Sequence, residues 1–171
     1  MIFLNVGSNL SSTKGDRLFN LKKALELIVT ENIEIIKISS TYETPSYPDK
    51  KNPKFLNIGL EVKCDYTPKN LIKKFNNIEK KLQRVRGLKN KPRTCDIDLI
   101  DYNSKIINTK IISIPHPRAH LRNFVLFPLK EIYPMWIHPI LNKKIDFLIK
   151  KLSLKLRNEI TRIEERVIMS K

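Results

Sequence analysis

The stretch FLNIGLEVKC at residues 55–64 constrains the fold more than any other part of the chain, because it places an apolar side chain at every second position. Successive side chains of a β-strand point to opposite faces of the sheet. One face of this strand is therefore apolar and made by Leu56, Ile58, Leu60 and Val62. The other face carries Phe55, Asn57, Glu61 and Lys63. The chain must build a sheet whose apolar face is covered by other elements.

Further strands and helices can be placed around this strand from hydrophobic spacing and capping residues. The pattern predicts four strands, at residues 2–7, 33–42 and 55–64 and from Asp96 onward. It predicts one helix opened by the N-cap Asp16, and a second that begins at Thr67–Pro68 and ends near Gly87. The order β-α-β-β-α-β predicts an α+β fold of the ferredoxin-like type, in which two helices cover one face of a four-stranded antiparallel sheet.

The remainder of the chain adds smaller elements to this plan. From Ser104 the sequence predicts a short hairpin, then the segment NFVLFPLKEIYP. A further helix follows, with an apolar face made by Ile145, Leu148, Ile149 and Leu152. We expect a single domain over residues 1–171, with the tail beyond about residue 155 forming an appended helix.

The run RTCDIDLI at residues 93–100 sets two aspartates two positions apart among apolar residues. Because the apolar residues of this strand must face the helices, Asp96 and Asp98 face the opposite side of the sheet, together with Phe55 and Asn57. Two adjacent carboxylates repel each other unless a cation lies between them. Oxygen ligands of this kind favour Mg²⁺ that also binds substrate phosphates. We therefore expect a binding site on this face.

The formal net charge of +16 raises the question of a nucleic-acid partner. The chain is rich in Lys, Asn and Ile, as expected of an AT-rich coding sequence, so much of the charge has a compositional explanation. Arginine is the more informative cation, and it gathers at Arg84, Arg86, Arg93, Arg118 and Arg122. The planar guanidinium suits bidentate binding of polyphosphate.

The composition and motifs exclude several classes of protein. No apolar run reaches the ~18 residues of a membrane helix, and the start MIFLNVGSNL lacks a basic leader. The nearest approach to a P-loop, GSNLSSTKG, has Ser12 where the second glycine is needed. Cys64 and Cys95 fit no metal spacing, which suggests a reduced cytoplasmic protein. His116 and His120 lie in the same segment as two arginines and are candidates for an anion site.

Six stretches of the chain form a recognisable set in order and spacing, namely VGSNL at 6–10, SSTYETP at 39–45, FLN at 55–57, RVR at 84–86, PRTCDIDLI at 92–100 and IPHPRAHLRNFVLFPL at 114–129. On these residues the chain resembles the 6-hydroxymethyl-7,8-dihydropterin pyrophosphokinase family of folate biosynthesis, to about residue 140. It implies a ferredoxin-like fold. It also implies a Mg²⁺-dependent reaction in which diphosphate passes from ATP to the hydroxymethyl oxygen of the pterin and AMP is released.

The resemblance implies roles for individual residues. Asp96 and Asp98 would hold two Mg²⁺ ions and, with Arg84 and Arg93, would be the catalytic residues. The nucleotide would be bound by Glu79, Arg84, Arg86, Arg93, Ile100, Ser113, His116 and Arg122. The pterin would be bound by Gly7, Thr44, Pro45, Tyr47, Phe55, Asn57, Asp96 and Phe124. Within that set the two phenylalanine rings would sandwich the pterin, and Asn57 would read its hydrogen-bonding edge.

Four positions depart from the family pattern, namely Asn90, Lys91, Ile111 and Pro117.

Two other interpretations stay open beside a working enzyme. One is a basic RNA-binding module of the same topology, although its aromatic RNP run is missing. The other is a catalytically weakened relative. We expect ATP and the hydroxymethyl dihydropterin as small-molecule partners, a monomer, and neither nucleic acid nor membrane as a partner.

Overall fold

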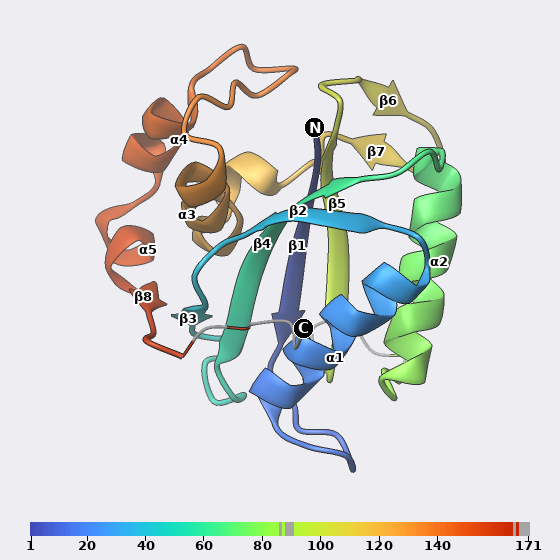
Figure 1. The fold of residues 1–171 in the computed structure, drawn as a ribbon. Helices are drawn as coiled ribbons and strands as arrows, with labels where there is room; N and C mark the ends of the chain where they lie inside the picture. Colours follow the sequence, from blue (N-terminus) through green and yellow to red (C-terminus); the bar gives the residue numbers. More distant parts are fainter. Residues whose placement is uncertain (86, 88–90, 166, 168–171) are drawn as a thin grey trace.

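The computed structural model describes residues 1–171 with the exception of 86, 88–90, 166 and 168–171. It is a mixed α+β structure in which helices lie on both sides of an antiparallel sheet (Figure 1). The first part of the chain forms β1 (Ile2–Ser8), α1 (Arg17–Thr30), β2 (Glu34–Ile38), β3 (Tyr42–Thr44), β4 (Phe55–Lys63), α2 (Pro68–Lys81) and β5 (Asp96–Tyr102).

The main sheet has the strand order β5-β1-β4-β3-β8, and β2 also pairs with β4. The strand pairs are antiparallel. The described residues thus form a six-stranded sheet where the sequence predicts four strands. One reason is that the predicted strand 33–42 is divided at residues 39–41 into β2 and β3. The other is that the short β8 (Thr161–Arg162) adds to the edge of β3.

The first face of the sheet packs against α1 and α2, as the alternation predicts. Leu56, Ile58 and Leu60 of β4 are buried together with the apolar stripes of both helices. The predicted N-caps are confirmed, since the Asp16 carboxylate accepts from the Phe19 N–H at 2.8 Å and Thr67 caps α2. The predicted end of the second helix near Gly87 is wrong, because α2 ends at Lys81.

Helix α2 stops early because the backbone turns just beyond it. Gln83 has φ of 64°, in the left-handed region that ends a helix. Its side chain exchanges hydrogen bonds with the hydroxyl of Thr13, at 2.8 and 3.0 Å. The apolar spacing continues through Leu82 to Val85 and suggests a longer helix, but Val85 is 90% exposed.

The second face of the sheet is partly covered by α3 (Asn123–Ile132), which α4 (Ile145–Lys151) supports. Phe3 and Ile100 of the sheet join a second core cluster with these helices. Gly59 makes the close packing of α3 feasible, since a Cβ there would lie 2.9 Å from both Phe3 and Pro128. The predicted inward face of the helix at 145–152 is confirmed by the burial of Ile145, Leu148 and Leu152.

The segment after β5 forms the predicted hairpin and then returns to the sheet. It consists of β6 (Ile107–Asn108), β7 (Ser113–Ile114) and a 3₁₀ turn at Ala119–Leu121. The His116 N–H donates to the Ile100 carbonyl at 2.9 Å, which ties the segment to the end of β5. This contact brings residues 116–124 beside the second face of the sheet.

Beyond residue 155, where an appended helix is expected, the described residues form the short α5 (Leu154–Asn158) and then β8. The Ile163 N–H donates to the Thr41 carbonyl at 3.0 Å, and Val167 is buried in the first core cluster.

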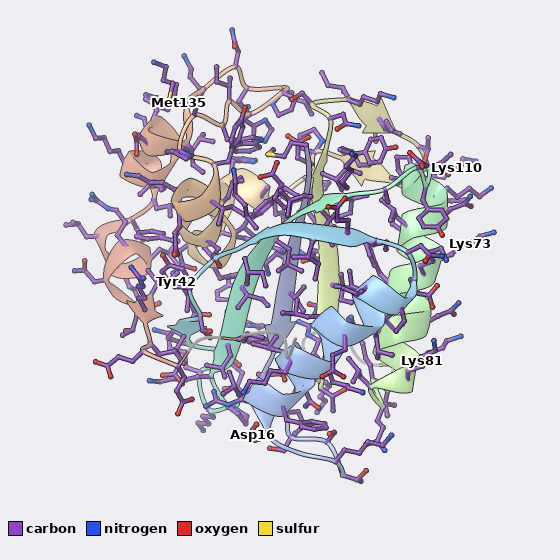
Figure 2. All side chains as sticks on the ribbon, in the orientation of Figure 1. Asp16, Tyr42, Lys73, Lys81, Lys110 and Met135 are labelled. Carbon is purple, nitrogen blue, oxygen red and sulfur yellow. The ribbon has the colours of Figure 1, made fainter. Side chains whose placement is uncertain are left out.

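Lysines line the outside of α2, among them Lys73 and Lys81 (Figure 2). Within the described part of the chain no helix is long and apolar enough to cross a membrane.

Candidate active site

The register of three strands gathers polar residues in one row across the second face of the sheet. Gly7 of β1 lies opposite Asp96 on β5 and opposite Asn57 on β4. In the next row Asn5 lies opposite Asp98 on one side and Gly59 on the other. The predicted parity is confirmed, because both aspartates lie on the face that α1 and α2 do not cover, with their apolar neighbours buried in the first core.

Gly7 keeps this row open. A Cβ at this position would stand 3.0 Å from the Asn57 Oδ1 and 3.5 Å from the Phe55 ring. Asn57 is itself fixed, since its Nδ2 donates to the Thr44 Oγ1 at 3.1 Å and both residues are buried. The edge of the Asn57 amide is therefore held in one orientation toward the space above Gly7.

Asp96 lies between two arginines. The Arg84 guanidinium donates to Asp96 Oδ1 and also to Glu79 Oε1. On the other side, Arg93 Nε is 3.4 Å from Asp96 Oδ2. Burial opposes the charge of Arg84, but Asp96 and Glu79 outweigh it and raise the pKa of Arg84. Glu79 is buried and also accepts from the Ile97 N–H at 2.9 Å, which joins α2 to the start of β5.

Asp98 has one close cationic partner among the described residues, because Arg122 Nη1 donates to its Oδ2 at 3.1 Å. Burial and the charge of Asp96 raise the pKa of Asp98 to about 6, despite the opposing effect of Arg122 and Arg93. Burial also lowers the pKa of Arg122. The face thus carries two carboxylates and three arginines in contact with one another.

His116 stands beside Arg122 as a neutral imidazole. Burial and the charges of Arg122 and Arg118 lower the pKa of His116 to about 4. The Arg118 N–H donates to its Nδ1 at 3.1 Å, so the proton of the neutral ring is on Nε2. That nitrogen is 3.4 Å from Arg122 Nη1 and faces the same space. His116 can therefore donate a hydrogen bond to an anion at neutral pH.

Two aromatic rings border the carboxylates, and each lies against an arginine. The Arg93 guanidinium is 5.4 Å from the centre of the Phe55 ring, and the Arg122 guanidinium is 5.3 Å from that of Phe124. Both rings are only partly buried. Such rings can stack against a flat heterocycle.

A cleft of about 340 Å³ opens between the hairpin, α2 and β5. Its polar lining includes Asn76, Glu79, Arg84, Asp96, Asp98, Ser113 and His116. Its apolar lining consists of Ile72, Ile97, Leu99, Ile111, Ile112, Ile114 and Pro117. A cleft with an apolar wall on one side and Arg84 beside two carboxylates at one end has the form expected for a nucleotide with its phosphates at the charged end.

Comparison with known protein families supports the same interpretation. The model of the 7,8-dihydro-6-hydroxymethylpterin-pyrophosphokinase (HPPK) family matches residues 3–134, which is most of the chain. The chain belongs to the HPPK family.

Individual HPPK relatives agree with this assignment. The 2-amino-4-hydroxy-6-hydroxymethyldihydropteridine pyrophosphokinase of Aquifex aeolicus is 38% identical over 84% of this chain and 87% of its own length. The Bacillus subtilis protein of the same name is 36% identical over 76% of each chain. A mitochondrial folate synthesis bifunctional protein of Pisum sativum is also 36% identical, but the match covers only 24% of that longer protein.

A solved structure supports the fold. The crystal structure of wild-type Plasmodium falciparum HPPK-DHPS superposes with a TM-score of 0.69 over 94% of this chain, at 18% identity. The match spans 47% of that longer chain.

Three residues that the sequence singles out do not line the cleft, namely Tyr47 and Ile100, which the resemblance implies, and His120, a candidate for an anion site. Tyr47 is 84% exposed in the loop after β3, next to the half-buried Pro45. Ile100 is fully buried in the second core and contributes its carbonyl oxygen to the His116 N–H. His120 lies away from the cleft, with its ring 5.5 Å from that of His138.

The positions that depart from the HPPK pattern fall in different places. Ile111 is 76% exposed and lines the cleft with Pro117, which is also exposed. Lys91 is exposed just before the clustered arginine at position 93. Arg86 and Asn90 lie outside the described residues.

Sequence reasoning assigns no role to two buried asparagines beside the site. Asn5 lies between Asp98 and Gly59, and its buried Oδ1 has no hydrogen-bond partner in the described part of the chain. Asn9 follows β1 and contacts the backbone of Arg93. Asn9 belongs to the VGSNL stretch that carries the family resemblance, which assigns it no role of its own, and Asn5 is marked only as a polar amide in an otherwise apolar strand.

Proposed function

We propose that this chain transfers diphosphate from ATP to the hydroxymethyl oxygen of 6-hydroxymethyl-7,8-dihydropterin and releases AMP, as a step of folate synthesis. The observation that carries the proposal is the pair Asp96 and Asp98, which is in contact with Arg84, Arg93 and Arg122 beside a cleft of mixed polar and apolar lining. Two carboxylates by themselves repel phosphate. Beside arginines they can take part in binding a polyphosphate when a divalent cation lies between the carboxylates and the phosphate oxygens.

We propose Asp96 and Asp98 as the ligands of two Mg²⁺ ions. The donor set fits, because it offers only carboxylate oxygens on adjacent rows of one face, and Mg²⁺ commonly uses one or two carboxylates plus waters and phosphates. The described residues contain no group of three or more His, Cys, Asp and Glu side chains that could hold a metal, so further ligands would come from ATP and water. When bound, Mg²⁺ supplies positive charge against the phosphate oxygens.

In the reaction, the pterin hydroxyl oxygen attacks the β-phosphorus and its proton passes to water, the bond from that phosphorus to the oxygen of the α-phosphate breaks, and AMP leaves. Arg84 and Arg93 hold the transferred oxygens, and His116 donates from Nε2 to the phosphate chain. Arg122 lies between Asp98 and His116, where it neutralises charge that develops as the bridging oxygen departs. Glu79, Ser113 and the apolar slot with Ile100 behind it bind the nucleoside, and Arg86 belongs to the same nucleotide set.

For the pterin, we propose a slot between the rings of Phe55 and Phe124, above Gly7. The orientation of Asn57, fixed by Thr44, supports its role in reading the polar edge of the ring. Pro45 and Tyr47 belong to the loop that would border this slot. Asp96 is the group that the slot shares with the phosphate site.

We further propose a ferredoxin-like core, in which β2 and β3 count as one interrupted strand. The order β5-β1-β4-β2/β3 supports this reading, because only the short β8 then lies outside a four-stranded sheet. We also propose one domain over residues 1–171, a cytoplasmic monomer, and no nucleic-acid partner. The acidic pair on the open face supports the last point, since it opposes the binding of a phosphate backbone.

The test is AMP formation from ATP and the hydroxymethyl dihydropterin, followed by chromatography with and without Mg²⁺. We expect stoichiometric AMP and pterin diphosphate only when Mg²⁺ and both substrates are present. Binding of both ligands without AMP would indicate a catalytically weakened relative. Binding of RNA with neither small molecule bound would overturn the proposal.

A further inference from the structure

Asn9 is a buried amide at the point where three segments of the chain meet. It directly follows β1 and is only 2% exposed. Its side chain makes three hydrogen bonds to segments that are distant in the sequence. A buried amide with both ends used in this way fixes the relative positions of its partners.

The first of these partners is the backbone of Arg93, through both its N–H and its carbonyl. The Arg93 N–H donates to Asn9 Oδ1 at 2.7 Å. The Arg93 carbonyl accepts from the N–H groups of both Asn9 and Leu10 at 3.1 Å. The backbone N–H and the backbone carbonyl of Arg93 are thus both held by residues 9 and 10. The side chain of Arg93 extends from this clamp to Asp96 and to the Phe55 ring.

The second partner is the loop between β3 and β4. Asn9 Nδ2 donates to the Ser46 Oγ at 3.0 Å and to the Pro53 carbonyl at 3.1 Å. The Ser46 hydroxyl in turn donates to the same Pro53 carbonyl. The loop thus closes onto Asn9 just after Thr44 and Pro45, which border the proposed pterin slot.

We propose that Asn9 is a positioning residue that holds Arg93 and the loop of residues 45–54 in one frame, so that the arginine meets the phosphates where the pterin oxygen attacks. The inference rests on the proposed function, because it assigns Arg93 to the phosphates and the loop to the pterin. Asn9 touches neither ligand and acts through the arginine. A misplacement of about 1 Å in a catalytic group costs on the order of a hundredfold in rate.

The first experiment measures single-turnover formation of AMP by Asn9→Ala at saturating ATP and pterin. We expect the rate to fall at least tenfold, while the dissociation constant for ATP changes less than threefold. Asn20→Ala is the matched control. Asn20 is equally buried and bonds the neighbouring Leu10 carbonyl at 3.0 Å, but its side chain makes no hydrogen bond to Arg93 in the described part of the chain. We expect its rate within threefold of the parent.

A double-mutant cycle tests whether Asn9 acts through Arg93. In the Arg93→Ala background, Asn9→Ala should lower the single-turnover rate by less than threefold, because the group that it positions is already gone. Equal fold-losses in both backgrounds would overturn the inference and make Asn9 a residue of general stability. An Asn9→Ala rate equal to that of the parent would also overturn it.

Asn9→Asp keeps the test open if the alanine variant does not fold. It retains the oxygen that accepts from Arg93 but loses the donor to Ser46 and Pro53. We expect a weaker affinity for the pterin, by fivefold or more, with a single-turnover rate within tenfold of the parent once saturated. Unchanged pterin affinity would overturn the role of the loop contact. If the parent chain forms no AMP at all, the proposed function fails instead, so the two failures are distinguishable.

Discussion

The carboxyl of Asp98 lies where its ionisation lowers the free energy of unfolding. Its pKa is raised to about 6 by burial and by Asp96, so the folded protein binds a proton more readily than the unfolded chain between pH 3.8 and about 6. The free energy of unfolding therefore falls as pH rises through that window, and the full cost is present above it. A residue of this kind is expected where binding of a cation repays the cost.

Asp98→Asn should separate the effect of this charge on stability from its effect on catalysis. We expect AMP formation to fall at least about a hundredfold, because charge stabilisation by a bound metal is worth several kcal/mol. At pH 8 we expect the variant to melt at or above the temperature of the parent, since the partly buried charge is gone and the amide oxygen still accepts from Arg122. Activity assays and thermal melts check this, with Asp65→Asn on the exposed surface as the control.

The ring of Phe124 gives a second prediction for a single residue. Phe124→Ala should weaken binding of the pterin by fivefold or more, because stacking contributes about 1 kcal/mol beyond the buried area. The affinity for ATP should change less than twofold. Calorimetric titration of each ligand measures both, and Phe147→Ala on α4 is the control. Equal losses for the two ligands would place the ring in the structural core rather than against the pterin.

At the scale of elements, the break between β2 and β3 depends on a residue from α3. Glu131 accepts from the Ser40 N–H at 3.0 Å, from its hydroxyl at 2.8 Å and from the Tyr42 hydroxyl at 2.8 Å. Burial and Glu131 raise the pKa of Tyr42 to about 12, so the hydroxyl stays a donor at neutral pH. The carboxylate takes the place of a strand partner where the ladder is interrupted.

Glu131→Ala should therefore lower the free energy of unfolding by about 1–3 kcal/mol, because it leaves buried donors without a partner. Urea denaturation measures the change. Glu26→Ala removes an exposed ion pair with Lys23 on α1 and should cost less than about 0.5 kcal/mol. A loss for Glu131→Ala as small as that of the control would show that water replaces the carboxylate.

This contact also shows where prediction from sequence stops. The alternation of β4 and the caps Asp16 and Thr67 act locally, so the strands and helix starts they imply are correct. The break at residues 39–41 was not predicted because its acceptor lies 91 residues away. The same holds for the candidate site. Parity places Asp96, Asp98, Phe55 and Asn57 on one face, but the contact of Asn9 with Arg93 spans 84 residues.

For the whole molecule, a histidine far from the cleft makes stability depend on pH. His138 is 3% exposed, and its ring packs against those of Trp136 and His120. Burial and the charge of His120 lower the pKa of His138 to about 4. The unfolded chain therefore binds the proton more readily, so stability is fully present above pH 6.5 and is lost as pH falls toward 4.

We expect the contribution of His138 to reach up to about 3 kcal/mol across that window. His138→Phe should flatten this part of the profile. Urea unfolding of both proteins at pH 7.5, 5.5 and 4.5 isolates the effect, because Asp98 and His116 titrate in both and cancel in the difference. Parallel profiles for the two proteins would show that His138 is not responsible.

The pairing of β8 with β3 has a consequence for how the protein behaves in concentrated solution. Tyr42 and Glu43 face Arg162 and Thr161 across this pair, so the outer backbone groups of β3 are occupied. An open strand edge is a template for the edge of another molecule. The residues that cover it lie beyond 134, where the family match ends. We expect a chain shortened to end after α5 to keep the proposed catalytic groups and yet self-associate and precipitate, which light scattering measures, so that colloidal stability depends on a segment beyond the residues that the family model matches.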